Sequence, residues 1–426
     1  MVLLIGVMLL LMLLGIPIGY AIGIASLFYV VFVSDISAMV IAQQISAGAD
    51  SLVMVALPFF LLAGEIMNES GITQKLTRFA LSLIGPIRGG LSHVVVIANV
   101  LVAMVSGAAI ANAAAVGSTM IPIMVRKGYP KDFAAAVNAA SSIIGAVIPP
   151  SVGFIIYASV SGVSVGKLFL AGTVPGILLA IGMIIVCAII AKIENHPKGE
   201  SYSIKEFCNS FIHALPGLFM PIIVLGGIFS GVVTPTEAGA LAVVYGLVVG
   251  LFVYRTLKFR NLPSIFLNAA KRSASILFII AGAACFGFLL SREMDVTAFV
   301  RFFHFFEGYP ALMMLSIIGV ILLLGMFMEG GSIMVILTPF LLPLVVSFGI
   351  DPVHFGVVFQ IAIMVGLLTP PLGILLFVIS GTSDVPIKSI CFRLLPFFVI
   401  IIMILLLVAF VPSISLWLVQ QQGKNL

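Results

Sequence analysis

Two short stretches decide the fold of this chain: Gly145-Ala-Val-Ile-Pro-Pro150 and Gly366-Leu-Leu-Thr-Pro-Pro371, each inside a long apolar run. A proline pair removes two amide donors and moves the preceding residue out of the α region. A helix through either run must therefore break, near Ile148 in the first run. Unpaired backbone is tolerated at membrane depth only where it is buried in protein or lines a watery cavity. Both breaks are therefore candidate binding sites.

The two stretches belong to an internal repeat. Gly145 and Gly366 lie 221 positions apart, and upstream an offset of 218 pairs Pro17 with Pro235. The offset of 221 also pairs Gly128 with Gly349, and Pro122, Pro150 and Pro175 with Pro343, Pro371 and Pro396. Chance matches Leu with Ile in apolar sequences, but it does not hold Gly and Pro in one register. Two internal repeats that each contain one broken helix are typical of secondary transporters.

The composition sets the class of protein. Of 426 residues, 62% are hydrophobic and 8% are charged, and the mean hydropathy is +1.32. A soluble domain has about 25% charged residues, so the chain is a polytopic α-helical membrane protein. A β-barrel is excluded, because the apolar runs continue for roughly 20 residues, whereas barrel strands alternate over about ten. No nucleotide-binding, nucleophile or metal motif is present, which disfavours an enzyme or an ATP-driven pump.

The apolar and charged segments predict two inverted halves. Lys and Arg residues flank the segment 91–125 on both sides, which indicates a hairpin that enters the membrane and returns. Five spans and one hairpin in each half invert the second half relative to the first. We expect a first repeat over 1–195 with a broken helix at 132–162. A cytoplasmic linker at 196–213 follows, and then a second repeat over 214–420 with a hairpin at 310–346 and a broken helix at 353–383.

This topology places most positive charge in the cytoplasm. Of the 20 Lys and Arg residues, 16 lie on the cytoplasmic side, and the other four are Lys167, Arg292, Arg301 and Lys424. Both termini are then expected in the periplasm. The net charge of +5 reflects anchoring at the membrane and not binding to nucleic acid.

The broken helices predict two cation sites. The C-terminus of a half-helix presents free carbonyls with partial negative charge, which suit sodium or a proton. The facing hairpin tip completes each site. The first site comprises Met104, Ser106, Gly107, Gly145, Ile148 and Pro149. The second comprises Gly325, Met328, Gly366 and Thr369. The alternative is that the breaks are packing kinks and that the small residues serve helix packing.

Arg292 and Glu329 are the charged residues of most interest for a substrate. A guanidinium binds a carboxylate through two parallel hydrogen bonds, so Arg292 predicts an acidic substrate, although it could instead extend to the membrane surface. Glu329 and Ser332 lie at the second hairpin tip, Gly325-Met-Phe-Met-Glu-Gly-Gly-Ser332. Glu329 could orient Arg292, bind substrate hydroxyls or face water. Asn112 and Asn138 are expected to be hydrogen-bonded packing residues, and Glu65 is expected to be structural.

Three motifs resemble a known family. They are Gly-Ile-Phe-Ser-Gly-Val-Val-Thr-Pro-Thr-Glu-Ala-Gly at 227–239, Leu-Pro-Phe-Phe-Leu-Leu-Ala-Gly-Glu-Ile-Met at 57–67, and the two Pro-Pro loops. Over essentially the whole chain they resemble the large membrane subunit of tripartite ATP-independent periplasmic (TRAP) transporters. The resemblance implies an all-α, inverted-repeat elevator-type fold similar to that of divalent anion sodium symporters, with two re-entrant hairpins and two discontinuous helices.

The same resemblance implies function and partners. It implies sodium-coupled uptake of an organic acid across a bacterial inner membrane, with co-transported sodium and no organic cofactor. A small four-helix membrane subunit, expected as a separate chain, and a soluble periplasmic substrate-binding protein are the implied partners. The sodium sites of the family map onto the hairpin tips and Pro-Pro loops named above, and its substrate arginine maps onto Arg292.

The substrate and one other class of function stay open. Sialic acid is our single best expectation, and C4-dicarboxylates come next. An ion channel or a membrane scaffold is the alternative from another class. A channel more often shows rings of filter residues built by an oligomer, whereas inverted repeats with paired cation sites favour alternating access.

Overall fold

The computed structural model describes residues 2–37, 39–50, 52–83, 87–198, 203–293 and 309–424, and Arg301 lies outside them. Within these ranges the regular structure is helical, and the only β-type pairing is an isolated bridge between Arg88 and Lys198. Seven described helices are long and apolar enough to cross a membrane. The predicted all-helical, polytopic class is confirmed.

The helices of the first half run from α1 to α10. Their bounds are α1 (Val2–Leu13), α2 (Ile18–Phe32), α3 (Met39–Ala49), α4 (Leu52–Glu69), α5 (Ile72–Leu83), α6 (Gly90–Ser106), α7 (Ala109–Arg126), α8 (Lys131–Ser142), the 3₁₀ turn η1 (Ile143–Ala146), α9 (Val152–Ser161) and α10 (Val165–Ile193). The hairpin is α6–α7, and the broken helix is α8–α9.

The second half repeats this order. Its elements are α11 (Ile204–Phe229), α12 (Pro235–Val248), the π turn η2 (Val249–Val253), the 3₁₀ turn η3 (Phe259–Asn261), α13 (Leu262–Glu293), α15 (Pro310–Gly325), α16 (Gly330–Ser347), α17 (Pro352–Leu367), α18 (Ile374–Ser383), α19 (Ile387–Phe410) and α20 (Ser413–Lys424). The hairpin is α15–α16, and the broken helix is α17–α18.

The helix bounds follow the register of the sequence repeat. Adding 221 to the bounds of α7 gives 330–347, which are the bounds of α16. The same shift carries the start of α8 at Lys131 onto the start of α17 at Pro352. Glycine and proline fix where helices end, so a repeat of these residues becomes a repeat of helix ends.

Local signals explain the first break in each half. Gly15 has a φ of +83° and Pro17 precedes α2, so the first apolar run forms two helices, as predicted. In the second half, Thr234 caps α12. Its hydroxyl accepts a hydrogen bond from the Glu237 amide at 3.3 Å, and Glu237 Oε2 accepts from the Thr234 amide at 2.7 Å. This capping box is the one that the sequence predicts.

The linker expected at 196–213 is shorter in the structure. Helix α11 begins at Ile204, because Ser203 caps it and accepts a hydrogen bond from the Glu206 amide at 3.3 Å. Residues 204–213 are therefore helical and continuous with the apolar span that follows. The polar residues predicted where the apolar segment begins, but they did not show where the helix begins. A capped helix can extend beyond its apolar part.

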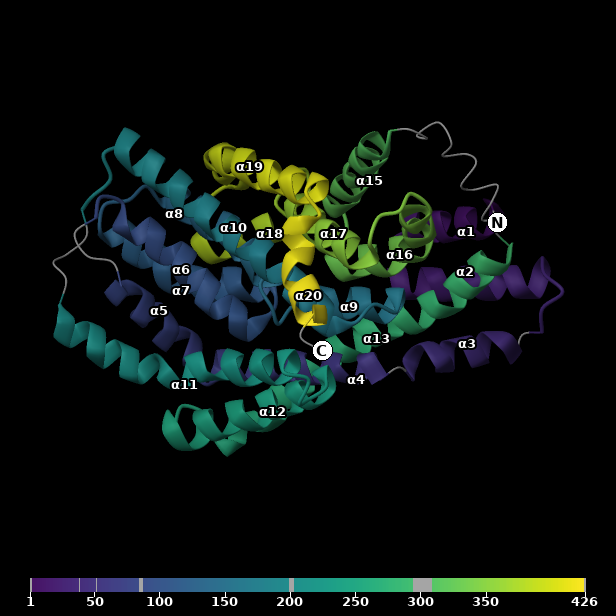
Figure 1. The fold of residues 1–426 in the computed structure, drawn as a ribbon, viewed down its shortest axis with the longest axis horizontal. Coiled ribbons are helices and arrows are strands. Elements are labelled where there is room, and N and C mark those ends of the chain that lie inside the picture. The colour runs from purple at the N-terminus through teal and green to yellow at the C-terminus, as the bar shows by residue number, and fades with distance from the viewer. Residues whose placement is uncertain are drawn as a thin grey trace.

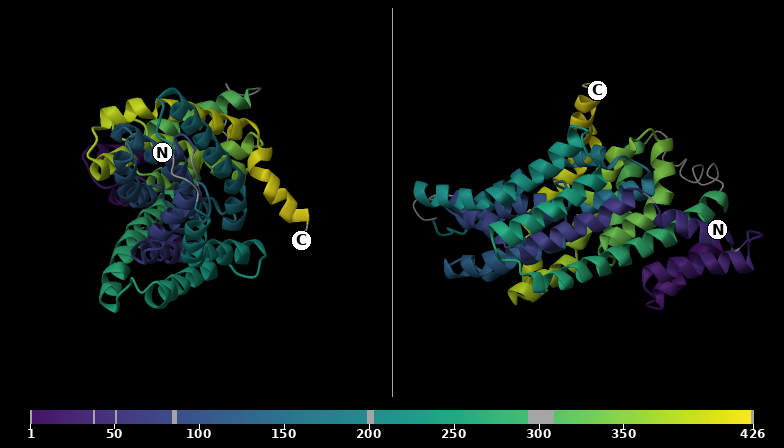
Figure 2. Two further views of the ribbon diagram at one scale, coloured as in Figure 1. Left: turned by 90° about the vertical axis from the view of Figure 1, so that its left-hand side faces the viewer. Right: turned by 90° about the horizontal axis from the view of Figure 1, so that it is seen from below.

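The helices form two groups. In Figure 1, α3, α4, α11, α12 and α13 lie together in the lower part of the molecule, and the hairpins and broken helices lie above them with α10 and α19. Figure 2 shows α20 projecting from the long axis of the other helices. The groups meet where α4 contacts α6 and α9 and where α13 contacts α16. This boundary contains the hairpin tips.

Candidate functional site

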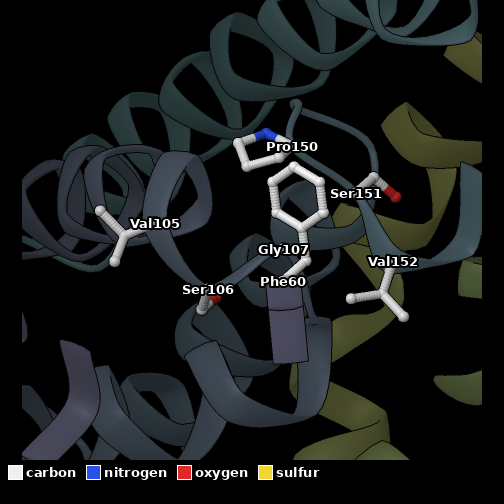
Figure 3. Close-up of a pocket in the computed structure, with 7 residues that line it drawn as sticks. All are labelled: Phe60, Val105, Ser106, Gly107, Pro150, Ser151 and Val152. Atoms are coloured by element: carbon white, nitrogen blue, oxygen red, sulfur yellow. The ribbon is translucent and has the colours of Figure 1, made fainter. Parts of the chain in front are cut away.

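The first hairpin tip meets the first Pro-Pro loop. Gly107 turns the chain between α6 and α7 with a φ of +63°. Its carbonyl accepts a hydrogen bond from the Val152 amide at 3.1 Å. A Cβ atom on Gly107 would lie 2.5 Å from the Pro150 carbonyl oxygen, so only glycine fits this approach. Phe60 of α4 lines a small pocket beside this contact, together with Ser106 and Ser151 (Figure 3).

The proline pair leaves two carbonyls without their helical donors. In a continuous helix the amides of residues 149 and 150 would bond the carbonyls of Gly145 and Ala146, but prolines have no amide hydrogen. Ala146 instead accepts hydrogen bonds from Ser151 Oγ at 2.6 Å and Gln360 Nε2 at 2.9 Å. The Gly145 carbonyl accepts none from the described residues. One free carbonyl therefore lies beside the hairpin tip.

A buried polar network supports the tip. The Ser106 hydroxyl donates to Asn112 Oδ1, and Asn112 Nδ2 donates to the Asn99 carbonyl at 3.1 Å. Asn99 continues the network to Asn138 and Ser141 at 3.2 and 2.8 Å. Asn112 and Asn138 are thus hydrogen-bonded, as predicted. Because the Ser106 proton is donated to the protein, the lone pairs of its oxygen stay available for a cation.

The remaining residues of the predicted first site lie differently. Gly145 packs against Asn112, because a Cβ there would lie 2.3 Å from Asn112 Nδ2. The Ile148 side chain packs on Gly176 of α10, so only its backbone, with that of Pro149, could serve a cation. Met104 does not line the pocket at the tip.

The second tip and loop are arranged similarly. A Cβ on Gly325 would lie 2.9 Å from the Gly366 Cα, and Met326 accepts a hydrogen bond from the Gly373 amide at 3.1 Å. This bond matches the one between Val152 and Gly107. The donors are 221 positions apart and the acceptors 219, so the second tip has slipped by two residues. The Met328 side chain packs against the hydrophobic core.

The free carbonyl of the second loop belongs to Leu367, which follows the predicted site residue Gly366. The Gly366 carbonyl accepts a hydrogen bond from the Thr369 amide at 2.9 Å. The Leu367 carbonyl accepts none from the described residues, because its helical donor would be residue 371, which is proline. The Thr369 hydroxyl donates to the Val365 carbonyl at 2.7 Å. As at Ser106, its oxygen lone pairs remain available.

A central cavity joins the two halves. It contains about 540 Å³ of empty space, part of it open to the exterior. Both hairpin tips, both broken helices and α13 contribute to its wall, through Gly107, Ala108, Ala109, Ile110, Ala146, Val152, Gly153, Ile156, Ile276, Glu329, Gly330, Gly331, Gln360, Met364 and Leu367. Glu329 is the only ionisable residue among these. Gln360 crosses from α17 to the Ala146 carbonyl in the other repeat.

Three helices begin at this cavity. Ser151 caps α9, and its hydroxyl accepts a hydrogen bond from the Phe154 amide at 3.4 Å. Glu329 caps α16 and accepts from the Ser332 amide at 3.2 Å. Helix α7 begins after Ala108 and has no side-chain cap. Its first amides have no hydrogen-bond acceptor among the described residues, Ala109 and Ile110 line the cavity, and the helix N-terminus carries partial positive charge. This arrangement suits an anionic group.

The predicted substrate residues are not all brought together. Glu329 lines the cavity, but Ser332 is buried beside it and supports the α16 cap. Arg292 lies in the last turn of α13, exposed and without an ion pair to a described residue. Ile276 of the same helix lines the cavity, and 16 residues of helix extend about 24 Å. Arg292 and Glu329 therefore lie apart.

Sequence reasoning missed several residues that build the site. Asn99 and Gln360 are buried. Each is a polar residue inside an apolar run of the sequence, and this pattern could have identified them. Leu367 was missed because its carbonyl matters and not its side chain; the signal was Pro371, four positions on. Glu65, expected to be structural, forms an ion pair with Arg272 between α4 and α13.

Comparison with known proteins gives consistent likenesses. The family model described as the DctM component of the tripartite ATP-independent periplasmic transporter matches residues 5–414. The sialic acid TRAP transporter large permease protein SiaM of Vibrio cholerae is 37% identical over 404 residues, with 95% of each chain covered. The C4-dicarboxylate TRAP transporter large permease protein DctM of Pseudomonas aeruginosa is 37% identical over 405 residues, again with 95% of each chain covered. Among solved structures, the YdaH transporter of Alcanivorax borkumensis shares the fold, with a TM-score of 0.63, 15% identity, and 88% and 87% of the two chains covered.

Proposed function

This chain belongs to the DctM component family of tripartite ATP-independent periplasmic transporters, and on that premise we propose that it is the permease subunit of a sodium-coupled importer of an organic acid. The family works with a small membrane subunit and a periplasmic binding protein. The chain is accordingly a multi-pass membrane protein. The coupling ion, the substrate and the orientation with both termini in the periplasm are parts of the proposal.

The convergence of three helix N-termini on the central cavity is the observation that carries the proposal. Broken or re-entrant helices in transporters direct their N-termini at anionic substrate groups. Here the amides of Ala109 and Ile110 at the uncapped start of α7 are free to bind a carboxylate. The hairpins and broken helices of both repeats contribute to the wall of this cavity.

Glu329 favours sialic acid as the substrate. Its carboxylate lines the cavity and can accept hydrogen bonds from substrate hydroxyls. A polyhydroxylated acid with one carboxylate would use both the α7 amides and Glu329. A C4-dicarboxylate would bring a second carboxylate close to Glu329, and like charges at short range are unfavourable. The C4-dicarboxylate reading is therefore second.

The two loops support sodium as the coupling ion. The first loop and its hairpin tip offer the free Gly145 carbonyl and the Ser106 hydroxyl oxygen, and the second loop offers the free Leu367 carbonyl and the Thr369 hydroxyl oxygen; both hydroxyl protons are donated elsewhere. Neutral oxygens of this kind coordinate sodium in transporters with broken helices. We place one cotransported sodium ion at each tip.

Arg292 can contact the substrate only if the hairpins and broken helices move along α13. Arg292 lies about 24 Å along the helix from the cavity wall. We propose that the hairpins and broken helices move past α13 during transport, in the manner of an elevator, and that Arg292 contacts the substrate carboxylate at another stage of this movement.

Uptake by proteoliposomes tests the function as a whole. Reconstituted with the small subunit and supplied with the cognate binding protein, the permease should import radiolabelled sialic acid only when sodium is higher outside. Uptake driven equally well by a proton gradient without sodium would disprove the coupling. Uptake that needs neither a gradient nor the binding protein would instead indicate a channel.

A pair of substitutions at Ala108 tests the anion site. Ala108→Asp would cap α7 and place a negative charge where the carboxylate should bind, so sialic acid uptake should fall at least about tenfold. Ala108→Asn also caps the helix and occupies one first-turn amide but adds no charge, so uptake should fall less in this variant than in Ala108→Asp. Equal transport by the two variants, normalised to inserted protein, would remove the α7 N-terminus from the substrate site.

A further inference from the structure

A polar pocket outside the central cavity lies between α5 and α11. It contains about 330 Å³ of empty space, part of it open to the exterior, and is lined by Lys75, Arg78, Asn209, Ser210 and His213. Figure 1 shows the two helices side by side. We call this feature the α5–α11 pocket. Every lining residue is polar, two are permanently positive, and none is acidic.

The positive groups of the pocket are not neutralised. Neither Lys75 nor Arg78 forms an ion pair with a carboxylate among the residues that the structure describes. The Lys75 ammonium lies 6.0 Å from the centre of the Tyr254 ring, a contact that orients a cation and leaves its charge in place. His213 bonds the Asn209 carbonyl through Nδ1 at 2.7 Å. Its Nε2 has no hydrogen-bond partner among the described residues and can bind a ligand.

Direct contacts hold the two helices together beside the pocket. Ser82 Oγ and Ser210 Oγ lie 2.6 Å apart. The Phe79 ring packs against those of Phe207 and Phe211 at centroid distances of 5.8 and 5.5 Å. The positive groups are thus held on a prebuilt surface, which lowers the entropy cost of binding a ligand.

The pocket lies at the boundary of the membrane. Helix α11 is a candidate membrane span, His213 is its last strongly polar residue, and residues 214–229 are nearly all apolar. These 16 residues extend about 24 Å, most of the roughly 30 Å of a bilayer core. Asn209, Ser210 and His213 therefore lie at the depth of lipid headgroups.

We propose that the α5–α11 pocket binds the phosphate group of an anionic phospholipid. A phosphate accepts several hydrogen bonds, and its negative charge can pair with the positive side chains of Lys75 and Arg78. Basic pockets between membrane helices bind such headgroups. The acyl chains would lie along the apolar part of α11. Because α5 leads into α6, a bound lipid ties the first hairpin to α11.

Native mass spectrometry of the chain in detergent tests the site. The protein is titrated with phosphatidylglycerol and, separately, with phosphatidylcholine. The double variant Lys75→Gln/Arg78→Gln should bind phosphatidylglycerol on the order of twentyfold more weakly than the wild type, because each basic residue near an anionic lipid contributes roughly fivefold. Binding of phosphatidylcholine should change by less than about twofold.

Two further variants make the test specific. Lys258→Gln/Arg260→Gln removes two exposed positive charges that do not line the pocket, and it should bind phosphatidylglycerol as the wild type does. Lys75→Arg/Arg78→Lys keeps both charges and should also bind, which shows that the pocket tolerates substitution. An equal loss in the Lys258/Arg260 variant, or equal binding of phosphatidylcholine by the wild type, would overturn the proposal. Inorganic phosphate that binds as tightly as phosphatidylglycerol would assign the pocket to a free anion and overturn the lipid.

Discussion

At the scale of single residues, the two hydroxyls at the loops carry the sharpest expectation. Ser106 and Thr369 each donate a proton to the protein and keep oxygen lone pairs for a cation. Thr369→Val keeps the shape of the side chain and deletes that oxygen. The sodium concentration for half-maximal uptake should rise about tenfold. The variant loses the contact between the Thr369 oxygen and the ion, and a polar contact to a charged group is worth ~1.5 kcal/mol.

Ser106→Ala should have the same effect on the first site, with a larger loss of stability because Asn112 loses a buried partner. Ser118→Ala is the control: its hydroxyl bonds the Ala115 carbonyl on the exposed face of α7. Uptake measured over a series of sodium concentrations tests whether Ser106 and Thr369 bind sodium. If Ser106→Ala and Thr369→Val both behave as Ser118→Ala does, sodium binds elsewhere.

Residues of the site differed in how far the sequence could predict them. Gly107 and Gly366 were predictable, because only glycine allows the close backbone approaches made there. The choice between the Gly366 and Leu367 carbonyls was not. It depends on whether the Thr369 amide turns back to residue 366, and that is a matter of local geometry after the helix has ended.

At the scale of elements, the hairpins and broken helices followed from the spacing of Gly and Pro. The difference in exposure between the two loops did not. Ser151 of the first loop is buried, whereas Leu372, its equivalent 221 positions on, is 44% exposed. Two similar sequences cannot show which of them faces outward, because that depends on how the halves are placed in one conformation.

Cysteine labelling measures this asymmetry. In a background without the four native cysteines, Leu372→Cys should react with a water-soluble maleimide at least about tenfold faster than Ser151→Cys, since reaction requires access to the thiolate. Ser151→Cys is nearly isosteric, so slow labelling there reports burial and not misfolding. Equal rates would mean that both loops are equally open in the membrane.

At the scale of the whole molecule, the proposed role of Arg292 requires movement, because this residue lies far from the cavity. The wall of the cavity at Ile276 and the guanidinium at Arg292 belong to one continuous helix, so they cannot approach each other. The hairpins and broken helices, which build the rest of the cavity, must change their position on α13 if Arg292 is to meet the substrate. The sequence pointed to Arg292 by its charge and, through the family resemblance, as the substrate arginine, but neither signal gives its distance from the cavity.

The comparison of Arg292→Lys with Arg292→Ala tests that role. A carboxylate bound through two parallel hydrogen bonds needs the planar guanidinium, which a lysine ammonium cannot replace. Uptake should therefore fall at least about tenfold in both variants, while assembly with the small subunit persists. A residue that only anchors α13 at the membrane surface would behave differently, because lysine extends to the surface as well as arginine does. Near-normal uptake by Arg292→Lys, normalised to inserted protein, would therefore exclude Arg292 from the substrate path, and with it the need for the cavity to travel along α13 to reach this residue.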